Sequence, residues 1–134
     1  MAFDGDVYRG LAVRDRFGER DFTEAQKTAT RQMMTLWDDL IAPSFVEATG
    51  SPNTADIKFS NTTSDIYYAH AYYPGVVNAE SSSSDKITGT VWLNPGYNSG
   101  TNNLVTPTAG NYGFSAILHE IGHAIGLDHG GNYN

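Results

Sequence analysis

Three of the four histidines in this chain fall within eleven residues, and their spacing is that of metal ligands. His119 and His123 are four residues apart, so on a helix, which turns about 100° per residue, their side chains lie about 40° apart. Two imidazoles arranged in this way can direct a ring nitrogen at one metal ion, typically zinc. Glu120 points about 60° beyond His123, which is too far round for ligation but close enough to reach a water molecule at the metal.

A glycine between the second and third histidines allows the third to join this pair. Gly126 stands where the helix should end, and glycine readily adopts the left-handed conformation that reverses a chain. Such a turn would bring His129 back as a third ligand. Three protein ligands leave one position of a tetrahedral ion for water, which is typical of a catalytic zinc site. Three unconnected histidines are the alternative, but the chain's composition gives the pattern a chance probability of about 10⁻⁵.

The overall composition excludes several other functional classes. The chain has 134 residues, which suffice for one domain with a buried core, and a formal net charge of −7. This acidic balance argues against nucleic acid and against a membrane as partners. The absence of cysteine excludes disulfides, thiolate metal sites and a cysteine nucleophile. No apolar run approaches the roughly 18 residues needed to span a bilayer.

The first of two predicted helices begins at Thr23, which can form a capping box with Gln26. Pro43 should stop it, because proline cannot continue a helix. The apolar stripe predicted on this helix consists of Ala29, Met33, Leu36, Trp37, Leu40 and Ile41.

The second predicted helix, from about Tyr112 to Ile125, carries the first two histidines. Its apolar side chains lie opposite them on the helical wheel and should anchor the helix in a core. These apolar residues are Phe114, Ile117, Leu118, Ile121, Ala124 and Ile125.

Several segments between the helices have the composition of β-strands. They are residues 44–47, 55–59, 66–73 and 88–93, whereas residues 97–110 are predicted to form a long surface loop. Strands combined with two main helices predict an α+β fold, with helices on one face of a mixed, twisted sheet. We expect residues 1–134 to form a single domain.

The histidine segment resembles the zinc signature of the metzincin metallopeptidases, His-Glu-x-x-His-x-x-Gly-x-x-His. The run from His119 to Asn134, HEIGHAIGLDHGGNYN, is similar to HEIGHALGLxHPGDYN of the serralysin-like branch. Two departures matter: Gly130, where the branch has proline, and Asn132, where it has aspartate. Weaker matches in the family's order extend the resemblance over most of residues 20–134. They are residues 36–39, 45–47, 55–59, 69–72 and 91–94.

This resemblance implies a secreted zinc endopeptidase acting on protein or peptide substrates. His119, His123 and His129 would be the zinc ligands, and Glu120 the general base that moves a proton from water to the leaving amine. The family binds its substrate extended and antiparallel to the edge strand of the sheet. The segment that matches this strand is residues 68–73, and the candidate substrate-binding residues within it are Ala69, His70, Ala71 and Tyr72. A half-buried edge strand without a role in binding explains the same residues equally well.

Metzincins continue beyond the zinc motif into a lower subdomain with a methionine-containing turn. Met1, Met33 and Met34 all precede the motif, so none of them can form that turn. We therefore expect the metzincin-like upper subdomain, with the lower Met-turn subdomain absent and the missing C-terminal segment as a candidate partner. One alternative is a non-catalytic zinc-binding fragment or scaffold domain that needs a downstream segment for activity. Another, a peptidase of a different clan with a distant glutamate ligand, is disfavoured by Gly126 and His129.

Overall fold

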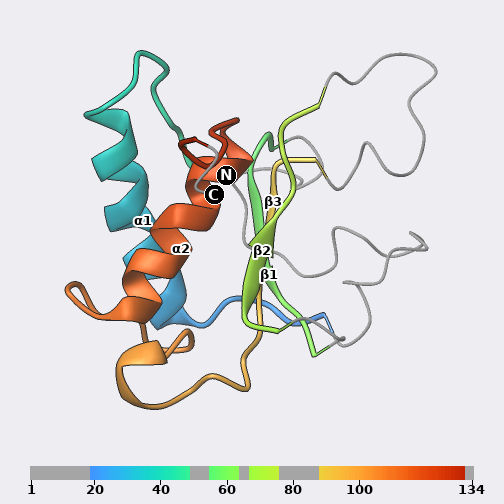
Figure 1. The fold of residues 1–134 in the computed structure, drawn as a ribbon, viewed down its shortest axis with the longest axis vertical. Helices are drawn as coiled ribbons and strands as arrows, with labels where there is room; N and C mark the ends of the chain where they lie inside the picture. Colours follow the sequence, from blue (N-terminus) through green and yellow to red (C-terminus); the bar gives the residue numbers. More distant parts are fainter. Residues whose placement is uncertain (1–18, 49–54, 64–66, 76–87, 132–134) are drawn as a thin grey trace.

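Two helices lie on one side of a three-stranded sheet in the computed structural model of the chain (Figure 1). The structure describes residues 19–48, 55–63, 67–75 and 88–131. In chain order the elements are α1 (Glu24–Asp38), β1 (Lys58–Asn61), β2 (Ala69–Ala71), β3 (Thr90–Leu93), the 3₁₀ helix η5 (Gly100–Asn102) and α2 (Tyr112–Ala124). This arrangement confirms the predicted α+β fold class.

The strands form a mixed sheet in the order β1-β3-β2. β1 pairs with β3 in parallel, whereas β2 pairs with β3 antiparallel. Among the described strands, β2 therefore forms one edge of the sheet, and α2 packs beside it.

The start of α1 agrees with the predicted capping box. The Gln26 backbone amide donates to the Thr23 hydroxyl at 3.1 Å, and the Thr23 backbone amide donates to the side-chain Oε1 of Gln26 at 2.7 Å. The predicted apolar stripe is wrong at its end, since Leu36 is 46% exposed and Leu40 is 74% exposed. The helix ends at Asp38, so Leu40 lies beyond it and its side-chain direction does not follow from helical spacing. The buried side of α1 consists of Gln26, Ala29, Thr30, Met33 and Met34.

The strand predicted at residues 44–47 is also wrong, because this segment is attached to α1 and not to the sheet. The Arg31 guanidinium donates to both carboxylate oxygens of Glu47 at 2.8 Å. The Phe45 amide donates to Asp38 Oδ1 at 2.8 Å. The other three predicted strands are present with different bounds: 58–61 for the predicted 55–59, 69–71 for 66–73 and 90–93 for 88–93. Residue 66 lies outside the described residues.

A buried pair of amide side chains joins α1 to the sheet. Gln26 is fully buried, and its Nε2 donates to Asn61 Oδ1 at 2.8 Å and to the Leu104 carbonyl at 2.9 Å. Asn61 Nδ2 donates in return to Gln26 Oε1 at 3.0 Å and to the Asp21 carbonyl at 2.9 Å. Leu104 is itself fully buried, so the predicted surface loop of residues 97–110 is anchored in the core.

The apolar face predicted for α2 is confirmed. Four of its side chains are at most 8% exposed and pack in the core between helices and sheet: Phe114, Ile117, Ile121 and Ala124. This packing fixes the helix and turns its opposite face outward. Within the described residues, neither helix combines the length and the apolar character that crossing a bilayer requires.

Candidate metal centre

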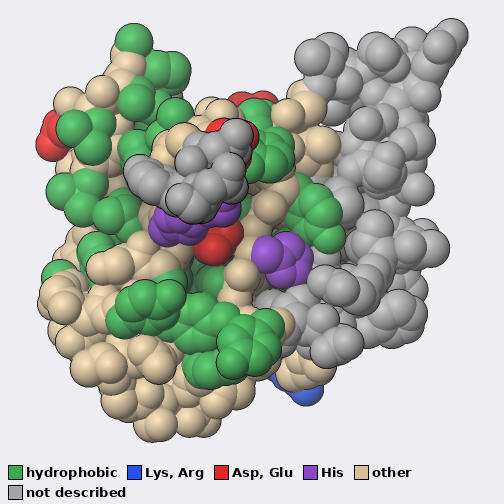
Figure 2. All heavy atoms as spheres, in the orientation of Figure 1, with side chains coloured by type: hydrophobic (Ala, Val, Ile, Leu, Met, Phe, Trp, Pro, Cys, Tyr) green, Lys and Arg blue, Asp and Glu red, His purple; other side chains and the backbone are tan. Residues whose placement is uncertain are grey.

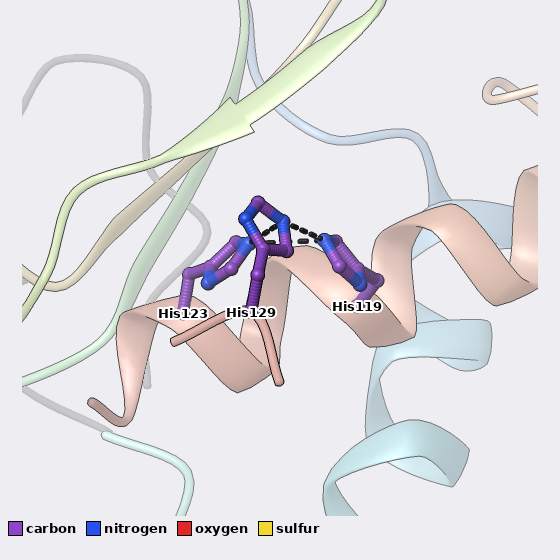
Figure 3. A group of neighbouring side chains, drawn as sticks. All are labelled: His119, His123 and His129. Atoms are coloured by element: carbon purple, nitrogen blue, oxygen red, sulfur yellow. Dashed lines mark hydrogen bonds between the residues drawn. The ribbon is translucent and has the colours of Figure 1, made fainter. Parts of the chain in front are cut away.

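The structure brings all three predicted ligands together. His119 and His123 project from α2 and His129 from the turn that follows, and their rings converge in Figure 3. The Nε2 atom of His123 lies 2.9 Å from that of His119 and 3.1 Å from that of His129. The Nε2 atoms of His119 and His129 are also 3.1 Å apart. Figure 2 shows histidine and acidic side chains gathered on one face of the molecule.

A glycine-dependent helix end places the third histidine. Gly126 has a φ of 105°, in the left-handed region predicted for it. Its amide donates to the His123 carbonyl at 2.9 Å, and the Leu127 amide donates to the Gly122 carbonyl at 2.9 Å. These two bonds are those of a Schellman motif, which satisfies the last carbonyls of a helix and reverses the chain.

The surroundings of His123 determine which of its ring nitrogens can bind a metal. His123 Nδ1 lies 2.7 Å from the Leu127 carbonyl oxygen, which can only accept a hydrogen bond. The proton of the neutral ring is therefore on Nδ1, and Nε2 offers a lone pair to the cluster.

The spacing and chemistry of the three nitrogens fit a zinc ion. Nitrogen ligands about 2.0 Å from one tetrahedral zinc ion are about 3.3 Å from each other, close to the 2.9–3.1 Å found here. Imidazole nitrogen is also a donor that zinc favours. The three histidines are a group that can hold one metal ion.

A contact that sequence reasoning missed connects the ligand turn to the end of the edge strand. The Tyr73 hydroxyl donates to Asp128 Oδ1 at 3.0 Å, and the same oxygen accepts the His129 amide at 2.7 Å. The His129 amide and then the Tyr73 hydroxyl hold the pKa of Asp128 below its usual range. The Tyr73 ring also meets the His123 ring edge-on, with centroids 5.6 Å apart. No sequence signal could have paired Tyr73 with Asp128, because 55 residues separate them.

Glu120 lies beside the histidines on α2 and is partly buried. Burial raises the pKa of Glu120 above its usual value, while the neighbouring histidines act in the opposite direction. A carboxylate with a raised pKa is a better proton acceptor near neutral pH, as a general base requires.

The backbone pairing of β2 shows which residues can bond to a peptide at this edge. The Tyr68 carbonyl accepts the Asn94 amide at 2.9 Å, and the Tyr72 amide donates to the Thr90 carbonyl at 2.9 Å. In an antiparallel ladder, backbone groups point alternately toward and away from the neighbouring strand. Every second residue, beginning with Tyr68, therefore bonds to β3.

This alternation separates the four predicted substrate-binding residues into two pairs. His70 and Tyr72 direct their backbone groups toward β3. Ala69 and Ala71 direct theirs away from β3, to the edge that no other described strand covers. Their small side chains pack against the core beside α2. Ala69 and Ala71 are thus the two positions at which an added strand can pair.

Comparisons with known proteins agree with this geometry. Residues 17–134 match the matrixin family (Peptidase_M10). The chain is 31% identical to serralysin of Proteus mirabilis over 131 residues, covering 90% of this chain and 26% of the relative. It is 36% identical to serralysin A of Dickeya chrysanthemi over 119 residues, covering 84% of this chain and 23% of the relative. It is 34% identical to metalloprotease AprA of Pseudomonas entomophila over 131 residues, covering 96% of this chain and 24% of the relative. The chain thus spans about a quarter of the length of these relatives.

Proposed function

Because the chain belongs to the matrixin family and is a serralysin-like metzincin, we propose that it forms the upper part of the catalytic domain of a zinc endopeptidase. The observation that carries this proposal is the convergence of three histidine Nε2 atoms within 3.1 Å of one another. His119, His123 and His129 hold the metal. The proposal covers residues 1–134 as one domain.

Zinc bound here supplies a Lewis acid that polarises the substrate carbonyl and makes water more acidic. Glu120 accepts the proton of the attacking water and returns it to the amine that leaves. The bond from His123 Nδ1 to the Leu127 carbonyl holds the ring in the tautomer that ligation needs.

We further propose that an extended protein or peptide substrate binds along β2. Its backbone pairs antiparallel with Ala69 and Ala71, whose amide and carbonyl groups point to the open edge, while His70 and Tyr72 support the strand from within the sheet. The resemblance to serralysin-like enzymes supports secretion of the native protein.

A second candidate is a non-catalytic zinc-binding fragment or scaffold that needs a downstream segment for activity. The observation in its favour is that the matched region covers only 26% of the Proteus mirabilis relative. In that case, the partner of the chain is its own C-terminal segment.

The deciding experiment measures casein cleavage and zinc content for the wild type and for Glu120→Gln, with and without a chelator. We expect chelator-sensitive cleavage that falls about 10²- to 10⁴-fold in Glu120→Gln while zinc stays bound at one per chain. Glu24→Gln, on the exposed start of α1, is the matched control and should cleave normally. Zinc bound one to one without wild-type cleavage would favour the scaffold. Loss of zinc in Glu120→Gln would show that Glu120 is a ligand and contradict its role as base.

A further inference from the structure

Four tyrosines form a connected group at the start of β2 and α2. The Tyr68 ring meets the Tyr97 ring edge-on at 4.7 Å and lies 5.8 Å from the Tyr112 ring. The Tyr67 ring lies 6.5 Å from that of Tyr97. Tyr67, Tyr68, Tyr97 and Tyr112 are called the tyrosine cluster below.

The tyrosine cluster combines a fixed centre with exposed flanks. The hydroxyl of Tyr68, the central ring, donates to the Asn102 carbonyl at 2.9 Å, which holds the ring in place. Tyr67 and Tyr112 are 90% and 61% exposed. The cluster therefore offers exposed aromatic surface to an incoming side chain, backed by a central ring that is held in place.

The tyrosine cluster and the metal centre lie on the same side of α2. Tyr112 precedes His119 by seven residues, which is about two helical turns, so the two side chains point within about 20° of each other and lie about 10 Å apart along the axis. Figure 2 shows hydrophobic side chains on the face that carries the histidines, over the ends of α2 and β2 that are lowest in Figure 1.

β2 and α2 run side by side between the cluster and the metal centre. Ring contacts join Tyr68 to Tyr112 at one end and Tyr73 to His123 at the other. The five residue steps along the strand from Tyr68 to Tyr73 and the eleven along the helix from Tyr112 to His123 both span about 17 Å, so the two elements cover the same distance between these contacts. His119 then lies opposite Ala71, and the cluster lies about three strand residues away toward Tyr68.

From this alignment we propose that the tyrosine cluster is a subsite for an aromatic or large apolar side chain of the substrate, about three residues C-terminal to the cleaved bond. The inference rests on the proposed function, in which the peptide runs antiparallel to β2. The C-terminal part of such a peptide extends toward Tyr68, at about 3.3 Å per residue.

The charge of the surrounding chain favours an uncharged occupant. Residues 88–118, which contribute Tyr97 and Tyr112, contain no Asp, Glu, Lys or Arg. The segment that contributes Tyr67 and Tyr68, residues 67–75, contains none either. An aromatic side chain can meet the exposed rings edge-to-face, whereas a charged one would find no opposite charge in either segment.

The test measures binding of two peptide hydroxamates to the zinc-loaded chain by calorimetry, so that it does not depend on turnover. Both carry the hydroxamate at the N-terminal end followed by three residues, with Phe or Ala at the third. We expect the Phe ligand to bind about three- to tenfold more tightly. In Tyr67→Ala and Tyr112→Ala this ratio should fall to about one. Leu40→Ala, an exposed apolar side chain beyond the end of α1, is the control and should keep the ratio.

Two other results would overturn the inference. Equal binding of the Phe and Ala ligands to the wild type would reject the subsite and leave the metal centre intact. Failure of both ligands to bind the zinc-loaded chain would show that the bound metal has no position open to a substrate, and would reject the proposed endopeptidase together with the subsite. A matched pair with the hydroxamate at the C-terminal end tests direction, because a Phe preference in that pair alone would place the subsite on the other side of the cleaved bond.

Discussion

The buried amide pair of Gln26 and Asn61 and the cluster of three histidines are both compact polar groups, but their hydrogen bonding differs. Both N–H groups of each amide have an acceptor, and each side-chain oxygen has a donor. In the histidine cluster, three ring nitrogens face one another, and His123 contributes a lone pair. The amide pair is complete within the protein, as buried structural groups usually are. In the proposed function, the histidine cluster is completed by a metal ion from outside the protein.

Removal of one imidazole is the most direct way to break the histidine cluster. His123→Ala should lower zinc affinity by more than about 100-fold, because even residues that only support a ligand contribute about 10- to 100-fold. The unfolding free energy of the metal-free protein should change little. Competition with a chromophoric chelator measures the affinity. The control is His70→Ala, which removes the fourth histidine, outside the cluster, and should leave the zinc affinity unchanged. Unchanged affinity in His123→Ala would contradict the ligand assignment.

The opposite pattern is expected for the amide pair. Gln26→Leu leaves the Asn61 side chain and the Leu104 carbonyl without their partner and should lower the unfolding free energy by about 2–4 kcal/mol. Zinc affinity of the folded protein should be unchanged. Urea unfolding of the metal-free chain measures the stability. Gln32→Leu, at an exposed position of the same helix, should change stability by less than about 0.5 kcal/mol. Equal effects of the two variants would show that the buried pair is dispensable.

The smallest effect on the unfolding free energy is expected for the exposed ion pair of Arg31 and Glu47. This pair sharpens the comparison with the buried amide pair because water can replace either of its partners. The bond from Arg31 holds the pKa of Glu47 below its usual value. The contribution of this ion pair to stability is therefore present at pH values above the ordinary pKa of a glutamate. It is lost as the pH falls through the lowered pKa of Glu47. Glu47→Gln should cost less than about 1 kcal/mol at pH 7 and less still in high salt. Urea unfolding at pH 7 and pH 3 should show the difference from wild type disappearing in acid, and a difference that persists at pH 3 would contradict the ion pair as its cause.

What the sequence predicts correctly about this molecule is local along the chain. Thr23 with Gln26, and the histidines with Gly126, each lie within a few turns of one helix, where periodicity fixes direction. The contacts that the sequence does not predict are between residues that are distant along the chain and are brought together by the fold. Gln26 bonds to Asn61 across 35 positions, and Tyr73 to Asp128 across 55. The prediction of a strand at residues 44–47 is wrong for the same reason, because the composition of this segment does not reveal that Arg31 of α1 bonds to Glu47.

The three proposed ligands all lie between residues 119 and 129, with the turn at Gly126 among them, and this affects how a bound metal would contribute to folding. Loops of four to six residues between ligands close with little entropic cost. The denatured ensemble therefore retains a weak chelating site in this same stretch. Only the difference in affinity between native and denatured chains stabilises the fold. The rise in melting temperature on adding zinc should accordingly be smaller than the affinity of the native protein alone would give.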